Sequence, residues 1–151
     1  GYIWLPVSDR HPGVVGMYLR HYSWARNKTP RAALLRSGIV GPGRKLVLMT
    51  APADAVFAWC YPLPGFNDGF TGVRCTIFRN EGPKRSSDLV KAADEMAWAK
   101  WPDEPRHYTW VWDAKVKSRN PGYCFKQAGW EAVGRNKSGE LSLLERVRGR
   151  G

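Results

Sequence analysis

Short apolar runs separated by turn residues recur from residue 45 onward and predict β-strands. Residues 45–50 and 55–61 are joined by the turn-forming segment Ala-Pro-Ala-Asp, and this pair predicts a β-hairpin. Further strands are expected over residues 70–78, 107–112 and 141–147. Gly72 interrupts the first of these and is a candidate β-bulge. The pattern therefore predicts a sheet that uses most of the chain after its first third.

Residues 87–101 carry the clearest helical pattern. Apolar residues from Val90 to Trp101 recur at the spacing of one helix face, and Pro102 follows as a stop signal. Other helices are expected over residues 12–24, 31–37 and 124–128. Because the helix over 87–101 joins two strands, it predicts a right-handed crossover and a parallel strand pair.

These elements predict a single α/β domain over residues 1–151. Residues 1–44 are expected to form a basic helical segment, and residues 45–147 the core. The sheet should be mixed and mostly antiparallel, because a hairpin precedes the crossover. A length of 151 residues suits one domain, and 43% hydrophobic and 25% charged residues exclude a disordered chain. No run of about 18 apolar residues occurs, so no membrane partner is expected.

Positive charge gathers at both ends of the chain. Residues 1–44 hold seven Lys and Arg against one acid, and residues 114–151 hold nine against three, so each segment carries +6. Residues 45–113 carry −1, and the whole chain +11. Clustered Lys and Arg bind phosphates by releasing counterions, so this distribution favours a nucleic acid as partner. A solvated basic surface without a partner is the alternative.

The three cysteines, Cys60, Cys75 and Cys124, are odd in number and form no Cys-x-x-Cys pair. They predict neither a disulfide framework nor a cysteine zinc site, and they fit a reducing compartment. We therefore expect a cytoplasmic protein.

The turn from Arg79 to Ser87 is the first candidate for chemistry. It leads from a predicted strand into the predicted helix over 87–101, and backbone N–H groups at such a turn form a cradle for anions. Gly82 allows close approach of a ligand, while Lys84 and Arg85 add positive charge. An ordinary capped connection is the alternative.

A second segment runs from Asn120 to Trp130, where an asparagine is followed by a short tyrosine-bearing helix and a Gly-aromatic pair. Together with Arg79-x-x-Gly82-x-Lys84, it resembles the signatures of the GNAT acyltransferase superfamily, although Lys84 stands where that family has a small residue. The resemblance covers roughly residues 45–147 and implies a GNAT-like fold with a splayed parallel central pair. It implies acetyl-CoA, or another acyl or glycyl donor, as a small-molecule partner. The residues that would then bind the donor are Arg79, Gly82, Lys84, Arg85, Ser86 and Asn120, with Tyr123 beside the reacting group.

The element His21-Tyr22-Ser23 precedes this core. A His-Tyr-Ser element followed by a GNAT-like domain with basic flanks resembles the Mom-type phage DNA-modification proteins, which implies the host cytoplasm as the location if a phage encodes the protein. Those proteins convert adenine in duplex DNA to an N6-carbamoylmethyl derivative, which protects phage genomes from restriction, and they are linked to an iron requirement. The resemblance implies a transferase with His21 and Tyr22 at the reaction centre and as the first candidate iron ligands.

Chemistry on an amine inside a duplex needs an extruded base and aromatic side chains that stack on it. Candidate stacking residues at predicted strands and loops are Tyr61, Phe66, Phe70, Tyr108 and Trp110. Candidate phosphate contacts, which would bind double-stranded DNA without reading its sequence, are Arg26, Lys28, Arg31, Lys115, Lys117 and Arg119.

Asp113, at the end of a predicted strand, and Glu81, in the first turn, are candidate proton acceptors. Asp113 is taken with His21, Tyr22 and Tyr123 as the expected catalytic set. The three histidines show no ligand spacing, and His107 is expected to be structural.

Two alternatives to adenine modification stay open. One is an acetyl-CoA-dependent N-acetyltransferase that acts on a protein or a small amine. The other is a nucleic-acid-binding domain without enzymatic activity. Because one fold supports many functions, the site has to decide between them.

Overall fold

The computed structural model describes residues 3–21, 28–63, 70–112 and 122–149. These residues form a seven-stranded sheet in the order β1-β2-β3-β4-β5-β7-β6. The strands are β1 (Leu5–Val7), β2 (Gly43–Met49), β3 (Ala55–Pro62), β4 (Val73–Asn80), β5 (Arg106–Trp112), β6 (Glu131–Arg135) and β7 (Leu141–Val147). The helices are α1 (Pro12–Leu19), α3 (Arg31–Ser37), α4 (Ser86–Lys100) and α5 (Tyr123–Gln127).

The predicted parallel pair is confirmed: β4 and β5 run parallel, and the other neighbouring strands pair antiparallel. The predicted hairpin is also confirmed as β2 and β3. The expected fold class, a single α/β domain with a mixed sheet and flanking helices, is therefore correct. Among the described helices, none is long and apolar enough to cross a bilayer.

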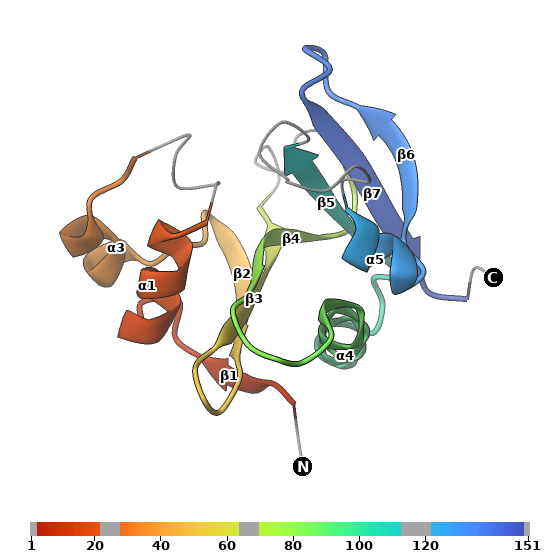
Figure 1. Ribbon diagram of the computed structural model, residues 1–151. Helices are drawn as coiled ribbons and strands as arrows, with labels where there is room; N and C mark the ends of the chain where they lie inside the picture. The colour runs from red at the N-terminus through yellow and green to blue at the C-terminus, as the bar shows by residue number, and fades with distance from the viewer. Residues whose placement is uncertain (1–2, 22–27, 64–69, 113–121, 150–151) are drawn as a thin grey trace.

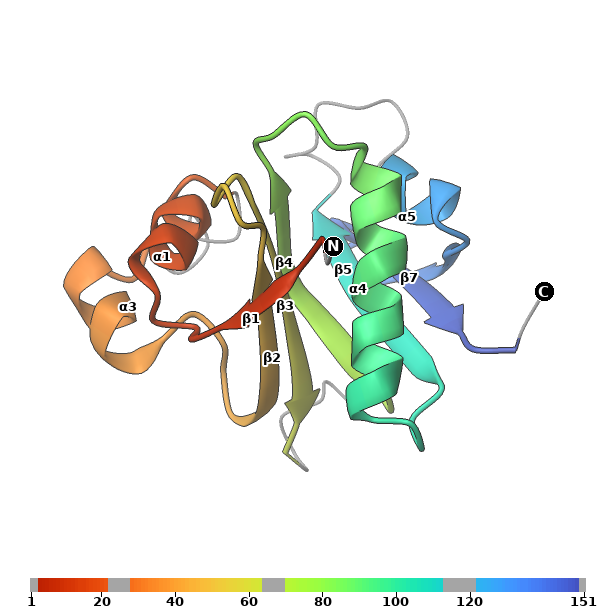
Figure 2. The ribbon, with the colours of Figure 1, turned by 90° about the horizontal axis from the view of Figure 1, so that it is seen from below.

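Helices cover both faces of the sheet (Figures 1 and 2). Along β3, Phe57 and Trp59 belong to the hydrophobic cluster that α4 and α5 cover. Val56 and Ala58, which alternate with them, belong to a second cluster that α1 and α3 cover. This alternation is the period of two that a strand imposes on its side chains.

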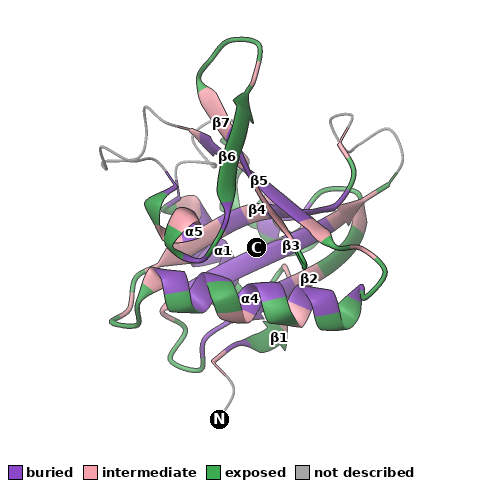
Figure 3. Ribbon diagram, turned by 90° about the vertical axis from the view of Figure 1, so that its right-hand side faces the viewer, coloured by how far each residue is buried: buried purple, intermediate pink, exposed green. Residues whose placement is uncertain are grey.

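The long helix α4 lies along the sheet with one buried stripe facing it (Figure 3). Its buried residues Leu89, Val90, Ala93 and Ala97 recur at helical spacing, as the sequence predicts. The hairpin of β6 and β7 extends beyond the helices, and every residue of β6 is exposed.

Two predicted boundaries and the predicted place of a β-bulge were wrong. The helix expected over residues 12–24 ends at Leu19, where the N–H groups of Arg20 and His21 bond to carbonyls three residues back in place of four. The strand expected to begin at residue 70 begins at Val73, because Gly72 has a φ of +122°. The bulge expected at Gly72 lies at Thr76 instead.

Candidate active site

A β-bulge in β4 creates the site. On β3, Ala58 pairs with Ile77 and the next residue, Trp59, pairs with Cys75, so Thr76 is an extra residue without a partner in the ladder. Because of this extra residue, side chains two positions apart on β4 point to opposite faces of the sheet. Cys75 packs on the α4 side of the sheet, whereas Ile77 packs on the α1 side. An extra residue also bends its strand, which turns the end of β4 away from β5.

The strands β4 and β5 pair only from Val73 and His107 to Cys75 and Thr109. At the end of this short ladder, the Thr109 hydroxyl donates a hydrogen bond of 2.9 Å to the Cys75 carbonyl. Beyond this point the ladder stops, and the two strands diverge. The bulge and the Thr109 hydrogen bond together mark the apex of the gap.

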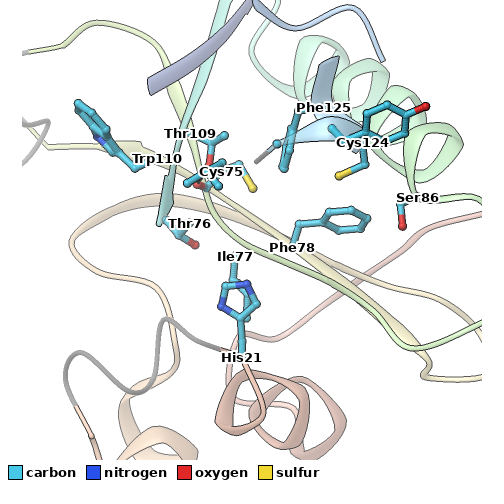
Figure 4. A pocket seen from close by; sticks show the side chains of 13 residues that line it. His21, Cys75, Thr76, Ile77, Phe78, Ser86, Thr109, Trp110, Cys124 and Phe125 are labelled. Carbon is cyan, nitrogen blue, oxygen red and sulfur yellow. Dashed lines mark hydrogen bonds between the residues drawn. The ribbon is translucent and has the colours of Figure 1, made fainter. Parts of the chain in front are cut away.

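A cleft of about 380 Å³ occupies the gap between the diverging strands (Figure 4). His21 and Ile77 contribute to it from the α1 side of the sheet, and Phe125 contributes from the opposite side. The cleft therefore passes between β4 and β5 and is lined from both faces. Its lining residues are His21, Cys75, Thr76, Ile77, Phe78, Ser86, Thr109, Trp110, Val111, Gly122, Tyr123, Cys124 and Phe125.

A second hollow of about 310 Å³ adjoins the cleft at the N-terminus of α4. It shares Ser86, Tyr123 and Cys124 with the cleft and adds Arg85. The N-cap residue Arg85 makes no side-chain hydrogen bond to the first turn of α4. The N-terminal N–H groups of a helix carry partial positive charge, so this hollow favours an anion next to an apolar cleft.

His21 lies against the cleft and is 8% exposed. Burial and the nearby charge of Arg79 lower its pKa to about 4, against the raising effect of a hydrogen bond with the Phe78 backbone. The imidazole is therefore neutral at pH 7 and keeps one nitrogen able to accept a proton or a hydrogen bond. The predicted place of His21 at the site depended on its motif alone, and the structure puts its side chain against the cleft.

The turn between β4 and α4 divides into two parts with different contacts. Arg85 and Ser86, two of the predicted donor-binding residues, line the hollows. Arg79 instead binds the Glu81 carboxylate at 2.5 Å and the Arg20 carbonyl. A side chain at Gly82 would collide with the Asp54 carboxylate, so this glycine serves packing against the β2–β3 hairpin.

Glu81 forms a clamp between the turn and the end of α1. Its carboxylate accepts hydrogen bonds from Arg20 at 2.7 and 2.8 Å and from Arg79. The bonds from Arg20 and Arg79 lower the pKa of Glu81 to about 2, with burial opposing them. Because Arg20 precedes His21, this clamp fixes the segment that carries the histidine. Glu81, a candidate proton acceptor from sequence, thus remains ionised and paired.

Two cysteines form part of the cleft wall. Burial raises the pKa of the Cys75 thiol far above its ordinary value and that of Cys124 to about 11. Both are therefore thiols at pH 7, which excludes them as ready nucleophiles. Tyr123 begins α5 and is 54% exposed at the mouth of the cleft, where its hydroxyl can reach a ligand.

Several predicted site residues are not brought to the cleft. Lys84 is exposed on the turn, and Lys28 and Arg31 are exposed at the start of α3. Of the stacking candidates, Tyr108 is fully buried and Tyr61 packs on Trp101, while Phe70 and Trp110 are half-buried. The predicted residues that lie outside the described part of the chain are Tyr22, Arg26, Phe66, Asp113, Lys115, Lys117, Arg119 and Asn120.

His107 is fully buried and is stacked on Trp98 at 4.6 Å. Its Nδ1 lies 2.7 Å from Asp94, whose other oxygen accepts a hydrogen bond from Trp130. It is therefore part of a packed polar cluster behind the cleft. Within the described ranges, no three His, Cys, Asp or Glu side chains gather as a metal site.

No family model and no curated protein sequence matches the chain. Solved structures do match it. An aminoglycoside 6′-acetyltransferase type Ii superposes with a TM-score of 0.62 at 15% identity, covering 95% of this chain and 96% of that one. A Bordetella pertussis protein assigned to the GNAT acetyltransferase family superposes with a TM-score of 0.50 at 12% identity, covering 95% of each chain. The seven-stranded sheet with its parallel pair β4–β5 is therefore the fold of the GNAT acetyltransferases.

Proposed function

We propose that this protein transfers an acyl group from a coenzyme A thioester to an amine. The observation that carries the proposal is the pair of adjoining hollows described above, which share Ser86, Tyr123 and Cys124. An apolar cleft between β4 and β5 opens directly onto the positive N-terminus of α4. The structural neighbours named as acetyltransferases support the same activity class.

The residues of the hollow fit the two chemically different parts of such a donor. Phe78 and Phe125 offer apolar contact to its extended arm and acyl group. Arg85 and the first N–H groups of α4 offer positive charge to its phosphates. An elongated ligand with an anionic end and a less polar arm would use both parts together.

The described side chains suit nucleophilic attack by an amine on a thioester carbonyl. The amine nitrogen forms a bond to the carbonyl carbon and gives up one proton to solvent, the carbon–sulfur bond breaks, and the sulfur leaves as a thiol after taking up a proton. Neutral His21 can accept a hydrogen bond from the amine on one side of the gap. Tyr123 lines the other side and can donate a proton to the departing sulfur.

Substitution of Ser86 by aspartate tests the donor site. Ser86→Asp places a negative charge where the phosphates should bind, while an acidic residue in the first turn stabilises a helix. We expect the affinity for acetyl-CoA to fall at least about tenfold through charge repulsion. Isothermal titration calorimetry measures the affinity, and thermal melting should show an unchanged or higher Tm.

The matched control is Ser8→Asp. Ser8 is exposed before α1, and its side chain accepts a hydrogen bond from the Arg10 backbone, which an aspartate can also accept. The same charge change there should leave the affinity unaltered. Equal affinity in the parent and Ser86→Asp proteins would reject the proposed donor site.

A second candidate function is modification of the adenine N6 amine in DNA. Two observations favour it over a small-molecule acceptor. The His21 side chain, which the resemblance to Mom-type proteins assigns to the reaction centre, lines the cleft. The net charge of +11 is suited to a polyanionic acceptor. In this case the acceptor would be an extruded base, and the transferred group and any iron requirement would follow the Mom-type reaction.

Mass spectrometry of nucleosides from plasmid DNA tests this second function after expression in a bacterial host. We expect a modified deoxyadenosine with the parent protein and none with His21→Ala. Thermal melting of both proteins separates a lost reaction from a lost fold. Unmodified DNA from the parent protein, together with acetyl-CoA turnover on free amines, would reject adenine modification and retain acyl transfer.

A further inference from the structure

An open groove of about 770 Å³ lies beside the cleft, between β4, β5 and the β6–β7 hairpin. Two half-buried aromatic residues, Phe70 and Trp110, form one wall. Arg74, Arg135 and Lys137 contribute positive charge, and none of the described residues that line the groove is acidic. The groove thus combines aromatic surface with cationic side chains.

The groove lies on the face of the sheet opposite α4. Val111 packs in the α4 cluster, and side chains alternate along a strand, so Trp110 projects to the other face. Arg74 projects to the same face, because its neighbours Val73 and Cys75 belong to the α4 cluster. On this face the β6–β7 hairpin extends away from α1 and α3 (Figure 1).

Trp110 connects this groove with the cleft, because it lines the groove as well as the cleft, where Figure 4 shows it. The donor hollow opens at the α4 N-terminus, on the side of Phe125 and Ser86. A ligand in the groove would therefore approach the gap from the side opposite the donor. That is the position an acceptor must take if donor and acceptor are to meet in the gap.

The aromatic wall is held in place by its surroundings. The rings of Phe70 and Trp110 meet edge to face with centroids 5.6 Å apart. The Arg106 guanidinium lies 5.7 Å from the centre of the Phe70 ring and donates a hydrogen bond to Thr71. On the hairpin, Arg135 donates to the carbonyl of Gly139, which fixes its guanidinium beside the groove. A fixed wall binds a planar ligand with little loss of side-chain entropy.

We propose that this groove binds unpaired nucleotides of a nucleic-acid strand. Arg74, Arg135 and Lys137 would contact phosphates, and Trp110 would stack on a base at the entrance of the cleft. Aromatic platforms beside cationic side chains are how proteins bind single strands without reading sequence. An acidic peptide would use the charges and leave the aromatic wall without a partner, so the aromatic content favours the nucleic acid. The inference concerns the acceptor side and goes beyond acyl transfer.

Fluorescence anisotropy of a labelled single-stranded 12-mer tests the groove without any donor or turnover. We compare Arg135→Gln/Lys137→Gln with Lys91→Gln/Lys100→Gln, which removes two equally exposed charges from α4. At low salt, Arg135→Gln/Lys137→Gln should bind the 12-mer at least about tenfold more weakly than the parent protein. The slope of log K against log salt should become less steep by about 1.4, because each of the two lost phosphate contacts contributes roughly 0.7. The α4 variant should keep the parent slope.

Trp110→Leu tests the stacking step, with an expected loss of about fivefold or more in affinity and little change in the salt slope. Should this variant fail to fold, Phe70→Leu, which removes the other ring of the aromatic wall, takes its place with the same expected result. Equal losses in the groove and α4 variants would overturn the proposal. The proposal would also be overturned if a poly-glutamate peptide bound the parent protein as tightly as the 12-mer does and lost affinity in Arg135→Gln/Lys137→Gln.

Calorimetry with acetyl-CoA on the same proteins separates this inference from the proposed function. The groove variant should retain the parent affinity for the donor. If the parent protein binds the single-stranded 12-mer but not acetyl-CoA, acyl transfer is rejected and nucleic-acid binding in the groove stands. If it binds acetyl-CoA but not the 12-mer, nucleic-acid binding is rejected and acyl transfer stands.

Discussion

Replacing Asp94 by alanine is expected to lower the free energy of unfolding by about 3–5 kcal/mol. Asp94 is 1% exposed, and its two oxygens bind His107 at 2.7 Å and the Trp130 indole at 2.9 Å. The His107 Nε2 already has no hydrogen-bond partner within the described residues. The substitution would leave Nδ1 unpaired as well, in a fully buried ring. Urea unfolding followed by tryptophan fluorescence measures the loss.

Glu95→Ala is the matched control for this prediction. Glu95 is the exposed neighbour of Asp94 on α4, and exposed substitutions change stability by about 0.5 kcal/mol or less. Asp94→Asn should lie between the two, because an amide oxygen can still accept the hydrogen bond from Trp130. Similar stability of Asp94→Ala and Glu95→Ala would show that the buried pair does not hold α4 to β5.

Phe57→Ala is expected to destabilise the protein by about 3–5 kcal/mol, as other large-to-small core substitutions do, and also to weaken donor binding. Phe57 is fully buried on β3. Its ring centre lies 5.3 Å from that of Phe78 and 6.3 Å from that of Phe125, and both of these line the cleft. Removing the ring leaves a void into which the cleft walls can move. We expect at least about a tenfold loss of acetyl-CoA affinity by calorimetry below the melting temperature, equivalent to roughly 1.4 kcal/mol.

Val56→Ala separates stability from cleft shape. Val56 is also fully buried, but its side chain packs on the α1 side of the sheet, away from Phe78 and Phe125. This variant should lose stability and keep the parent affinity for acetyl-CoA. If Phe57→Ala and Val56→Ala both lost acetyl-CoA affinity in proportion to their loss of stability, the prediction that Phe57 supports the cleft walls would be wrong.

Much of the fold could be predicted because its signals are local. The stripe on α4 needs only apolar residues at helical spacing, and the β2–β3 hairpin needs only two apolar runs around a turn. The parallel pair followed from a strand, a helix and a strand in succession. Strand β1 was missed because it has three residues, Leu5–Val7, with a proline at its centre. Its place depends on pairing with β2, a contact far away in the sequence.

The candidate site was predicted only in part, for the same reason. Arg85 and Ser86 were found because the turn and the helix start are adjacent in the chain. Arg79 was expected at the donor because its neighbours matched a motif, yet its partners are Glu81 and the Arg20 carbonyl. The latter lies 59 residues away, beyond the reach of any local pattern. His21 shows the opposite case, since a short motif predicted its importance and only the fold supplied its contacts.

The unpaired residue Thr76 has a consequence for comparing variants and related sequences. Before Thr76, the odd-numbered residues of β4 face α4. After it, the odd-numbered residue Ile77 faces α1, so the alternation of side chains shifts by one residue within the strand. An alignment that lost or gained one residue here would still look like a continuous strand. It would nevertheless assign every side chain from Ile77 onward to the wrong side of the molecule, exchanging residues of the α1 core with those of the cleft.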